Sequence, residues 1–322
     1  MAVETARAEK INIGASFRRA LVGLLSPAKI VRAIRLHRAR RTLSRTMSDE
    51  GLKFYAEILP GDFLHFGYFE DPNTNPREIS LADLERAQLA FTRLFIERMH
   101  DKKRPVLDVG CGMGGLSARL AAEGFVPVAL TPDVHQIAYI KEKYPAIELI
   151  RGRFEDIDAA AQAHRFGTII NSESLQYLDL EKSAKLVAKL LAPGGRWLIA
   201  DFFKTSAAYT GSGHVWENVK QTLAANGLAI VFERDITPNT AVTLRYIHML
   251  AEGVAMPIMR LGTGKLARKQ PGIHSMFKDF IDDLFALANY RIEVMSPEKQ
   301  LRERRYIFIE VARAEEAGKS LH

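Results

Sequence analysis

The sequence predicts an α/β fold in which a doubly wound, mostly parallel sheet carries helices on both faces. Short apolar runs of strand length alternate with helix-length amphipathic segments between residues 105 and 235, and this alternation is typical of parallel sheets. A glycine-rich turn, VLDVGCGMGG at residues 106–115, follows the first of these strands. The chain has 322 residues, so it can bury the large core that one elaborated domain of this kind needs.

Each expected strand is a short run rich in aliphatic residues, and each expected helix places its apolar residues on one face. Glycine commonly ends a helix, and Gly124 and the Gly194–Gly195 pair stand where two of these helices should stop. We expect strands at residues 105–110, 125–130, 147–152, 166–174, 196–203 and 228–236, with helices at 116–124, 133–145, 180–195 and 216–227.

The segments on either side of this core differ from it in composition. Residues 1–48 predict a basic amphipathic helical arm, and residues 49–104 an aromatic-rich segment followed by a helix that Ser80 can cap. Residues 236–322 predict a helical insertion and closing edge strands. Within it, we expect residues 262–272 to form a flexible connection, and residues 290–295 and 304–314 to pair as antiparallel strands at the sheet edge.

The net charge of +7 belongs to the N-terminal arm. Residues 1–48 hold eleven Lys or Arg against two Glu, a balance of +9, so the remaining 274 residues carry a balance of −2. A basic amphipathic arm suits contact with an anionic membrane, but it is also compatible with a solvated helix that packs on the body. The near-neutral body argues against a long nucleic-acid footprint, and we expect no DNA partner.

The single cysteine, Cys111, excludes an intramolecular disulfide and any multi-cysteine zinc site. We therefore expect no metal centre and a cytoplasmic protein, with association to a membrane left open. Cys111 lies in the glycine turn itself, where a small buried side chain fits, and we do not expect it to act as a nucleophile.

The glycine turn occupies the place where open α/β sheets bind their ligand, beyond the carboxyl end of the first strand. VLDVGCGMGGLSARLA resembles motif I of the class I S-adenosylmethionine-dependent methyltransferases, and TPDVHQIAYIKEK, RGRFEDI, FGTIINSESLQYL and LLAPGGRWLIADFF follow in the order of that family. The resemblance implies a seven-stranded Rossmann-like sheet and S-adenosyl-L-methionine as cofactor, with residues 105–235 as its binding core. It also implies that the methionine portion is held by Asp108, Gly110, Cys111, Gly112 and Gly114.

Two positions depart from the family pattern. Ala129 stands where the family usually has the acid that binds the ribose, which leaves Thr131 and Asp133 as candidates. Arg153 stands where an aspartate is common near the adenine, which leaves Phe154, Glu155 and Asp156 as candidates.

The stretch DFLHFGYFED at residues 62–71 is similar to the aromatic segment that precedes motif I in the cyclopropane-fatty-acid synthase, sterol and tocopherol methyltransferase branch. In that branch the segment closes over the cofactor, which implies a water-excluding lid here with Tyr68 beside the cofactor. Aromatic rings also attract a sulfonium cation. His65, in the same segment, is a candidate catalytic residue.

Methyl transfer requires mainly that the acceptor be placed in line and that water be excluded, and a base is needed only if the acceptor must lose a proton. The candidates at the rim of the site are Glu173, Gln176, Tyr177 and His214. We expect a small, hydrophobic or lipid-like acceptor methylated at carbon, oxygen or nitrogen. Two alternatives stay open: an RNA methyltransferase that uses the basic arm, and a non-catalytic binding protein with this fold.

Overall fold

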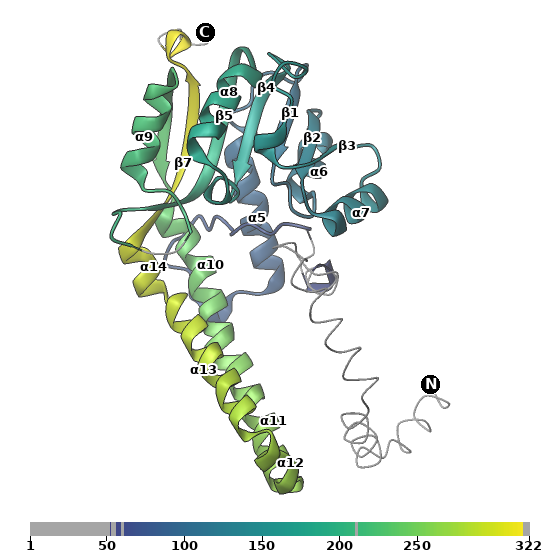
Figure 1. Ribbon diagram of the computed structural model, residues 1–322, viewed down its shortest axis with the longest axis vertical. Coiled ribbons are helices and arrows are strands. Elements are labelled where there is room, and N and C mark those ends of the chain that lie inside the picture. The colour runs from purple at the N-terminus through teal and green to yellow at the C-terminus, as the bar shows by residue number, and fades with distance from the viewer. Residues whose placement is uncertain (1–51, 53–55, 59–60, 210–211, 318–322) are drawn as a thin grey trace, which may run out of the picture. The chain divides into compact units, whose positions relative to one another are not determined.

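The computed structural model describes residues 52, 56–58, 61–209 and 212–317, so the predicted basic arm of residues 1–48 lies outside the described residues. The centre is a seven-stranded sheet of order β3-β2-β1-β4-β5-β7-β6 (Figure 1). The strands are β1 (Pro105–Val109), β2 (Val126–Thr131), β3 (Glu148–Arg151), β4 (Phe166–Ser172), β5 (Leu191–Lys204), β6 (Leu228–Asp235) and β7 (Arg304–Arg313). The predicted doubly wound fold is confirmed.

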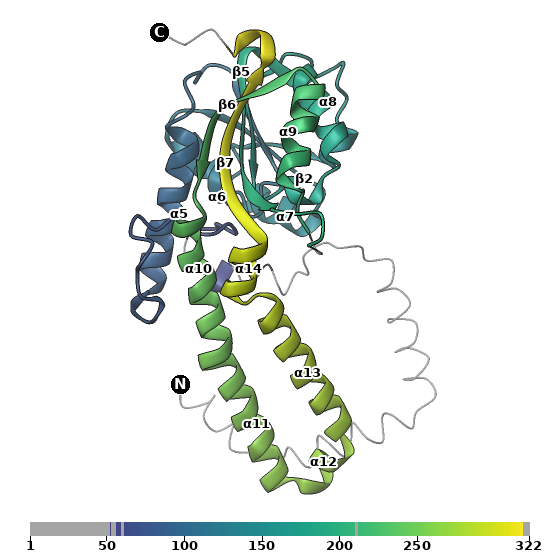
Figure 2. The same cartoon turned by 90° about the vertical axis from the view of Figure 1, so that its left-hand side faces the viewer.

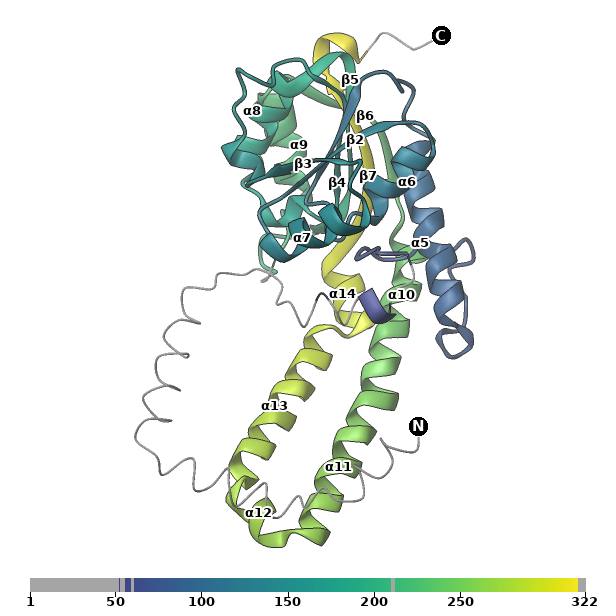
Figure 3. The same ribbon diagram turned by 90° about the vertical axis from the view of Figure 1, so that its right-hand side faces the viewer.

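Strands β1 to β5 run parallel to one another, and β7 lies antiparallel between β5 and β6. Alternate side chains of β1 enter opposite apolar layers: Val106 packs with α5 (Leu81–Ile96) and α6 (Gly115–Ala122), while Leu107 packs with α8 (Leu180–Leu190) and α9 (Trp216–Ala225). The helices therefore cover both faces of the sheet (Figure 3). Helix α7 (Val134–Lys143) follows β2, and its Ile140 packs on Ala129 of that strand.

Short 3-10 turns complete the loops between these elements. They are η1 (Pro76–Glu78), η2 (Phe154–Asp156), η3 (Leu175–Tyr177) and η5 (Ala314–Glu316). Helix α5 begins as predicted at Ser80, whose hydroxyl accepts from the Asp83 N–H, while the Asp83 carboxylate accepts from the Ser80 N–H. This reciprocal pair satisfies two backbone donors at the helix start.

A helical hairpin is inserted between β6 and β7 and projects away from the sheet (Figure 2). It comprises α10 (Thr237–Leu250), the π-helical turn η4 (Ala251–Ala255), α11 (Met256–Lys269), α12 (Pro271–Met276), α13 (Lys278–Val294) and α14 (Pro297–Glu303). Across the described ranges of the chain, none of the helices combines the length and apolar character that a bilayer crossing requires.

Two predictions for this insertion were wrong. Residues 262–272 are not a flexible connection, because α11 continues through both glycines to Lys269 and α12 begins at Pro271. Residues 290–295 are not a strand, because α13 extends to Val294. Their alternating apolar pattern fits a strand, but β7 already pairs with β5 on one side and β6 on the other. The preceding helix therefore propagates through them.

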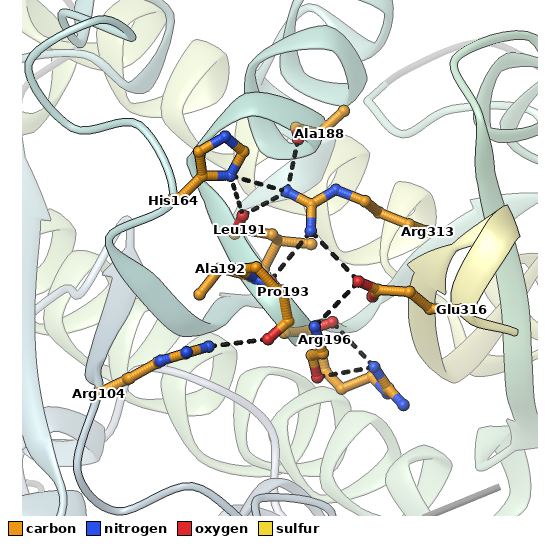
Figure 4. A network of polar contacts seen from close by, with 11 residues as sticks. Arg104, His164, Ala188, Leu191, Ala192, Pro193, Arg196, Arg313 and Glu316 are labelled. Atoms are coloured by element: carbon orange, nitrogen blue, oxygen red, sulfur yellow. Dashed lines mark hydrogen bonds and ion pairs between the residues drawn. The ribbon is translucent and has the colours of Figure 1, made fainter. Parts of the chain in front are cut away.

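A polar network lies at the end of the sheet where β5 begins and β7 ends (Figure 4). The guanidinium of Arg313 donates to the backbone carbonyls of Ala188, Leu191 and Ala192 and pairs with Glu316 at 3.6 Å. The Glu316 carboxylate in turn accepts from the Gly194 N–H at 3.0 Å. These bonds satisfy backbone carbonyls at the α8–β5 junction, at the opposite end of the parallel strands from the glycine turn.

Candidate active site

The glycine turn between β1 and α6 needs glycine for both conformation and space. Gly110 has a φ of +75° and Gly112 a φ of +57°, in the left-handed region that L side chains rarely adopt. A Cβ on Gly110 would stand 2.7 Å from the Cβ of Ser174, closer than real contacts allow. Gly114, also with positive φ, is the N-cap of α6. The turn therefore presents bare backbone at the start of a helix, where N–H groups favour an anionic ligand group.

Asp108 lies at the end of β1, directly before this turn, and its side chain is buried. Its Oδ2 accepts a hydrogen bond from the Ser117 hydroxyl at 2.7 Å. Burial raises the pKa of the Asp108 carboxyl to about 6, and the Ser117 bond opposes that rise. An ionised carboxylate beside helix N–H groups provides complementary partners for both charges of an amino acid moiety. The carboxylate, the N–H groups and the space left by the glycines fit the methionine end of S-adenosylmethionine.

Cys111 is buried against Ala129 and Ile140. Burial, together with the negative charge of Asp108, raises the pKa of its thiol well above the usual range. A neutral thiol is a poor nucleophile, which agrees with the structural role expected for this residue.

The segment of residues 62–69, which we call the lid, is fastened to α7 at its first residue. Asp62 is buried and accepts hydrogen bonds from the hydroxyls of Tyr139 at 2.8 Å and Tyr144 at 2.5 Å. Its carboxylate also pairs with the Lys143 ammonium at 2.6 Å. The next part of the lid meets the glycine turn, because a Cβ on Gly112 would lie 3.2 Å from Leu64 Cδ1. Asp62 thus holds the lid over the glycine turn.

The second half of the lid is held through its backbone by three other elements. The Gly67 N–H donates to Thr243 Oγ1 of α10 at 3.0 Å, and the Tyr68 N–H donates to the Ala87 carbonyl of α5 at 2.8 Å. The Phe66 N–H donates to the carboxylate of Glu173, just beyond β4, at 2.6 Å. The lid therefore connects the glycine turn to the end of β4.

Glu173 is a buried acid that contacts both the lid and β7 at this end of the site. It has a φ of +54°, and its Oε1 accepts from both the Phe66 N–H and the Tyr306 hydroxyl, the latter at 2.8 Å. Burial raises the pKa of Glu173 to about 7, although these two bonds lower it. A carboxyl with a pKa near neutrality can accept or release a proton under physiological conditions.

A second buried acid, Asp201 of β5, lies in the same environment. It accepts from the N–H groups of Gln176 at 3.0 Å and Phe202 at 2.8 Å. Burial, and secondarily the charge of Glu173, raises the pKa of Asp201 to about 7. The pKa of Tyr306 is raised well above its usual range by burial and by both acids. The three groups form a buried acidic cluster at the carboxyl end of the sheet.

A small apolar groove opens beside the lid residue Phe66. Phe202, which lines this groove, contacts Tyr306 of the acidic cluster, with 4.3 Å between the two ring centroids. Its walls come from the lid, the end of β5, α10, and the α14–β7 junction. They are Phe66, Phe202, Thr237, Thr240, Ala241, Leu244, Gln300, Leu301 and Arg304.

The other predicted catalytic residues have different surroundings. His65 is buried, stacks on Phe91 at 4.4 Å between centroids, and has a pKa lowered to about 4 by burial. Its Nδ1–H donates to the Phe66 carbonyl at 2.8 Å. His214 donates through Nε2–H to the Leu175 carbonyl at 3.0 Å, so it fixes η3. Tyr177 is 72% exposed in η3. Among the predicted catalytic residues, Glu173 bonds to the lid through the Phe66 N–H, and His65 is part of the lid itself.

Tyr68 and the predicted adenosine-binding residues are placed as follows. The Tyr68 ring packs against α5, and its hydroxyl accepts from Arg234 of β6 at 2.5 Å. Thr131 is the last residue of β2, and Asp133, two residues later, caps α7 by accepting from the His135 N–H at 2.8 Å. The Thr131 hydroxyl donates to Gln136 Oε1 at 2.7 Å.

Phe154 and Glu155 lie in η2 after β3. Phe154 is buried in the core of the sheet. The Glu155 side chain is 8% exposed, and its Oε1 accepts from the Asp179 N–H at 3.2 Å. Its Oε2 is buried and has no hydrogen-bond partner among the described residues. A buried acceptor of this kind suits an amino donor such as that of an adenine.

The sequence interpretation missed Asp201, Tyr306 and Asp62. Asp201 was visible as an acid inside the apolar run RWLIADFF, where a buried carboxylate needs partners. Tyr306 carried no such signal, because it lies more than 100 residues after Glu173 in sequence and meets it only through the antiparallel insertion of β7.

Comparison with known proteins supports the role of the glycine turn. Residues 106–195, which span the turn, β2, β3, β4 and α8, match the model of the methyltransferase domain family. This segment of the chain is thus similar to a methyltransferase domain. The cofactor of this domain family is S-adenosylmethionine, as the sequence resemblance implied.

Curated relatives match this methyltransferase domain and its surroundings. An O-methyltransferase of Pyrenophora dematioidea is 31% identical over 166 residues, covering 48% of this chain and 58% of that protein. The chloroplastic tocopherol O-methyltransferase of Arabidopsis thaliana is 29% identical over 156 residues, covering 44% of each chain. The chain thus spans about half the length of the curated relatives it matches.

A solved structure extends the likeness in fold beyond the domain. Geranyl diphosphate C-methyltransferase from Streptomyces coelicolor, solved with Mg²⁺, geranyl diphosphate and S-adenosyl-L-homocysteine, matches with a TM-score of 0.57 at 15% identity. The match covers 82% of this chain and 98% of that one. At this identity the likeness concerns the fold.

Proposed function

We propose that the protein transfers a methyl group from S-adenosylmethionine to a small, apolar or amphipathic acceptor, at carbon, oxygen or nitrogen. The observation that carries the proposal is the position of Glu173: its carboxyl is buried, is bonded to the lid that meets the glycine turn, and lies near an apolar groove. The substrates named for the relatives, tocopherol and geranyl diphosphate, are apolar or amphipathic and support this acceptor class.

The residues around the glycine turn would hold the cofactor. Asp108 and the backbone of Gly110, Gly112 and Gly114 would bind its methionine end, and S-adenosylmethionine supplies a methyl group that is already activated by the sulfonium. We assign the ribose to Thr131 and Asp133, and the adenine to Phe154 and the buried Oε2 of Glu155.

Within this arrangement, Glu173 is the general base for acceptors that must lose a proton. The Phe66 N–H and the Tyr306 hydroxyl both donate to Oε1, which fixes the plane of the carboxylate. The other oxygen, Oε2, then takes the proton from the methyl acceptor. The lid and the groove exclude water from the acceptor and hold it in line, which is the main requirement of methyl transfer. His65, Tyr177 and His214 remain predictions for the rim of the site.

The remaining parts of the chain surround this machinery. We propose that residues 49–104 supply the lid and its supporting helix, residues 105–235 the cofactor core, and residues 236–322 the cap over the groove and the closing strand. We further propose a cytoplasmic protein whose residues 1–48 contact membranes peripherally, because that segment holds nine more basic than acidic side chains.

The proposal is tested first by titration calorimetry with S-adenosylmethionine and S-adenosylhomocysteine, for which we expect binding of both. Transfer of a labelled methyl group is then measured against a panel of prenyl, quinol, fatty-acid and phenolic acceptors. Glu173→Gln should keep cofactor binding and slow the transfer to oxygen or nitrogen by about a hundredfold or more. Absence of cofactor binding at high micromolar concentration would refute the proposal.

A further inference from the structure

The helical hairpin between β6 and β7 exposes most of the large apolar side chains found on the described surface. Of the eighteen that are exposed, twelve lie between residues 247 and 295. Five of them follow one another along α10, η4 and α11, with Ile258 62% and Leu261 57% exposed. We call this set the outer stripe: Ile247, Leu250, Val254, Ile258 and Leu261.

The outer stripe lies on one side of a continuous helical path. Its members are spaced three or four residues apart, so they recur about once per turn of the helical path, the π-helical turn η4 included, and lie on one side of it. The opposite face of α11 holds Met256, which is buried, and Met259 and Leu266, which are partly buried. A helix with apolar residues on two opposite faces is usually covered on both, so the exposed stripe indicates a binding surface.

The charges near the outer stripe indicate which kind of partner this surface binds. From Gly253 to Lys278 the chain contains no Asp or Glu, and it contains five cations: Arg260, Lys265, Arg268, Lys269 and Lys278. Lys265, Arg268 and Lys269 are exposed and follow Leu261 by four, seven and eight residues, so they extend the outer stripe on the same face. An apolar stripe that continues into cations complements a surface with a hydrocarbon interior and anionic headgroups.

We propose that the outer stripe and its three cations dock this protein on an anionic lipid surface. The apolar side chains enter the boundary between headgroups and acyl chains, and the cations bind the phosphates. Helix α10 also supplies four residues that line the groove, Thr237, Thr240, Ala241 and Leu244. The docked helix thus leads from the membrane to the groove. This last point rests on the proposed function, because it gives the groove a lipid-like acceptor, whereas docking itself does not depend on methyl transfer.

The test is flotation of the full-length protein with vesicles of phosphatidylcholine, with and without phosphatidylglycerol. The triple variant Lys265→Gln, Arg268→Gln, Lys269→Gln should lower the partition onto phosphatidylglycerol vesicles about a hundredfold, since each cation near an anionic surface contributes about fivefold. The matched control Lys182→Gln, Lys185→Gln, Lys220→Gln makes the same change in net charge at exposed positions of α8 and α9, and should bind as the wild type does. Ile258→Ser with Leu261→Ser should lower the partition about tenfold or more.

Three results would overturn the proposal. The first is equal binding by the wild type and the triple variant at Lys265, Arg268 and Lys269, which would assign membrane contact to another segment. The second is an equal loss in both triple variants, which would indicate a general charge effect. The third is a concentration-dependent dimer, measured by sedimentation velocity, that the serine variant abolishes while vesicle binding is absent, since a second copy would then cover the stripe. Calorimetry with S-adenosylmethionine, unchanged in all variants, verifies the fold and reports separately on the proposed function.

Discussion

Replacement of Glu173 by glutamine should stabilise the protein more at alkaline pH than at acidic pH. Glutamine keeps an oxygen that can accept from the Phe66 N–H and the Tyr306 hydroxyl, but it removes a buried charge. The pKa of Glu173 is raised from 4.5 to about 7 in the folded protein. The folded state therefore binds more protons than the unfolded state between these values, and stability falls as the pH rises through that window.

The size of the effect follows from the same shift. Each unit of pKa corresponds to about 1.4 kcal/mol, so the ionised Glu173 carboxylate lowers the free energy of unfolding by about 3 kcal/mol at pH 8. At pH 5 the acid is largely protonated when folded, and the reduction is about 1 kcal/mol. Glu173→Gln should therefore exceed the wild type by about 3 kcal/mol at pH 8 and about 1 kcal/mol at pH 5.

Urea unfolding at both pH values, followed by circular dichroism, measures this difference. Glu142→Gln is the matched control, because Glu142 is an exposed glutamate on α7. A gap between Glu173→Gln and the wild type that is the same at pH 5 and pH 8 would show that Glu173 does not carry a buried charge, and would remove the basis for its role as a base. The same variant should transfer methyl groups more slowly even though it is more stable.

Three further substitutions test the turn, its acid and the opposite end of the sheet. Gly110→Ala should reduce S-adenosylmethionine affinity at least about tenfold in calorimetry, because its φ is positive and Ser174 occupies the space; Gly124→Ala, also at positive φ but with nothing within 4 Å, should leave affinity unchanged. Wild-type affinity should fall as the pH drops below about 6, where Asp108 is protonated, and Asp108→Asn should bind weakly at every pH; a pH-independent wild type contradicts this role. Arg313→Met should lower the free energy of unfolding by about 2–3 kcal/mol in urea, since three carbonyls lose a charged donor, and unchanged stability would show that water replaces it.

Local patterns were sufficient to predict most of the sheet, but β5 begins at Leu191, within the residues 180–195 that were expected to be helical. Runs such as VLDVG and FGTIINS are apolar over strand length and are bounded by glycine or polar turns, so they could be identified without their partners. The start of α5 at Ser80 was predictable for the same reason, since capping depends on residues within one turn. The helical structure of residues 290–294 was not predictable, because their alternation fits a helix as well as a strand and only the pairing of β7 excludes the strand.

The sequence by itself determined the glycine turn, the parallel order of elements and the cofactor class, because each depends on contiguous residues whose spacing reflects backbone geometry. Only the tertiary structure decided which acid faces the lid. Asp201 and Tyr306 lie in β5 and β7 and Glu173 lies just beyond β4, and their raised pKa values arise from burial that no single stretch of sequence reports. The structure likewise decided that the outer stripe is exposed, because an apolar helical face looks the same in sequence whether a core covers it or solvent does.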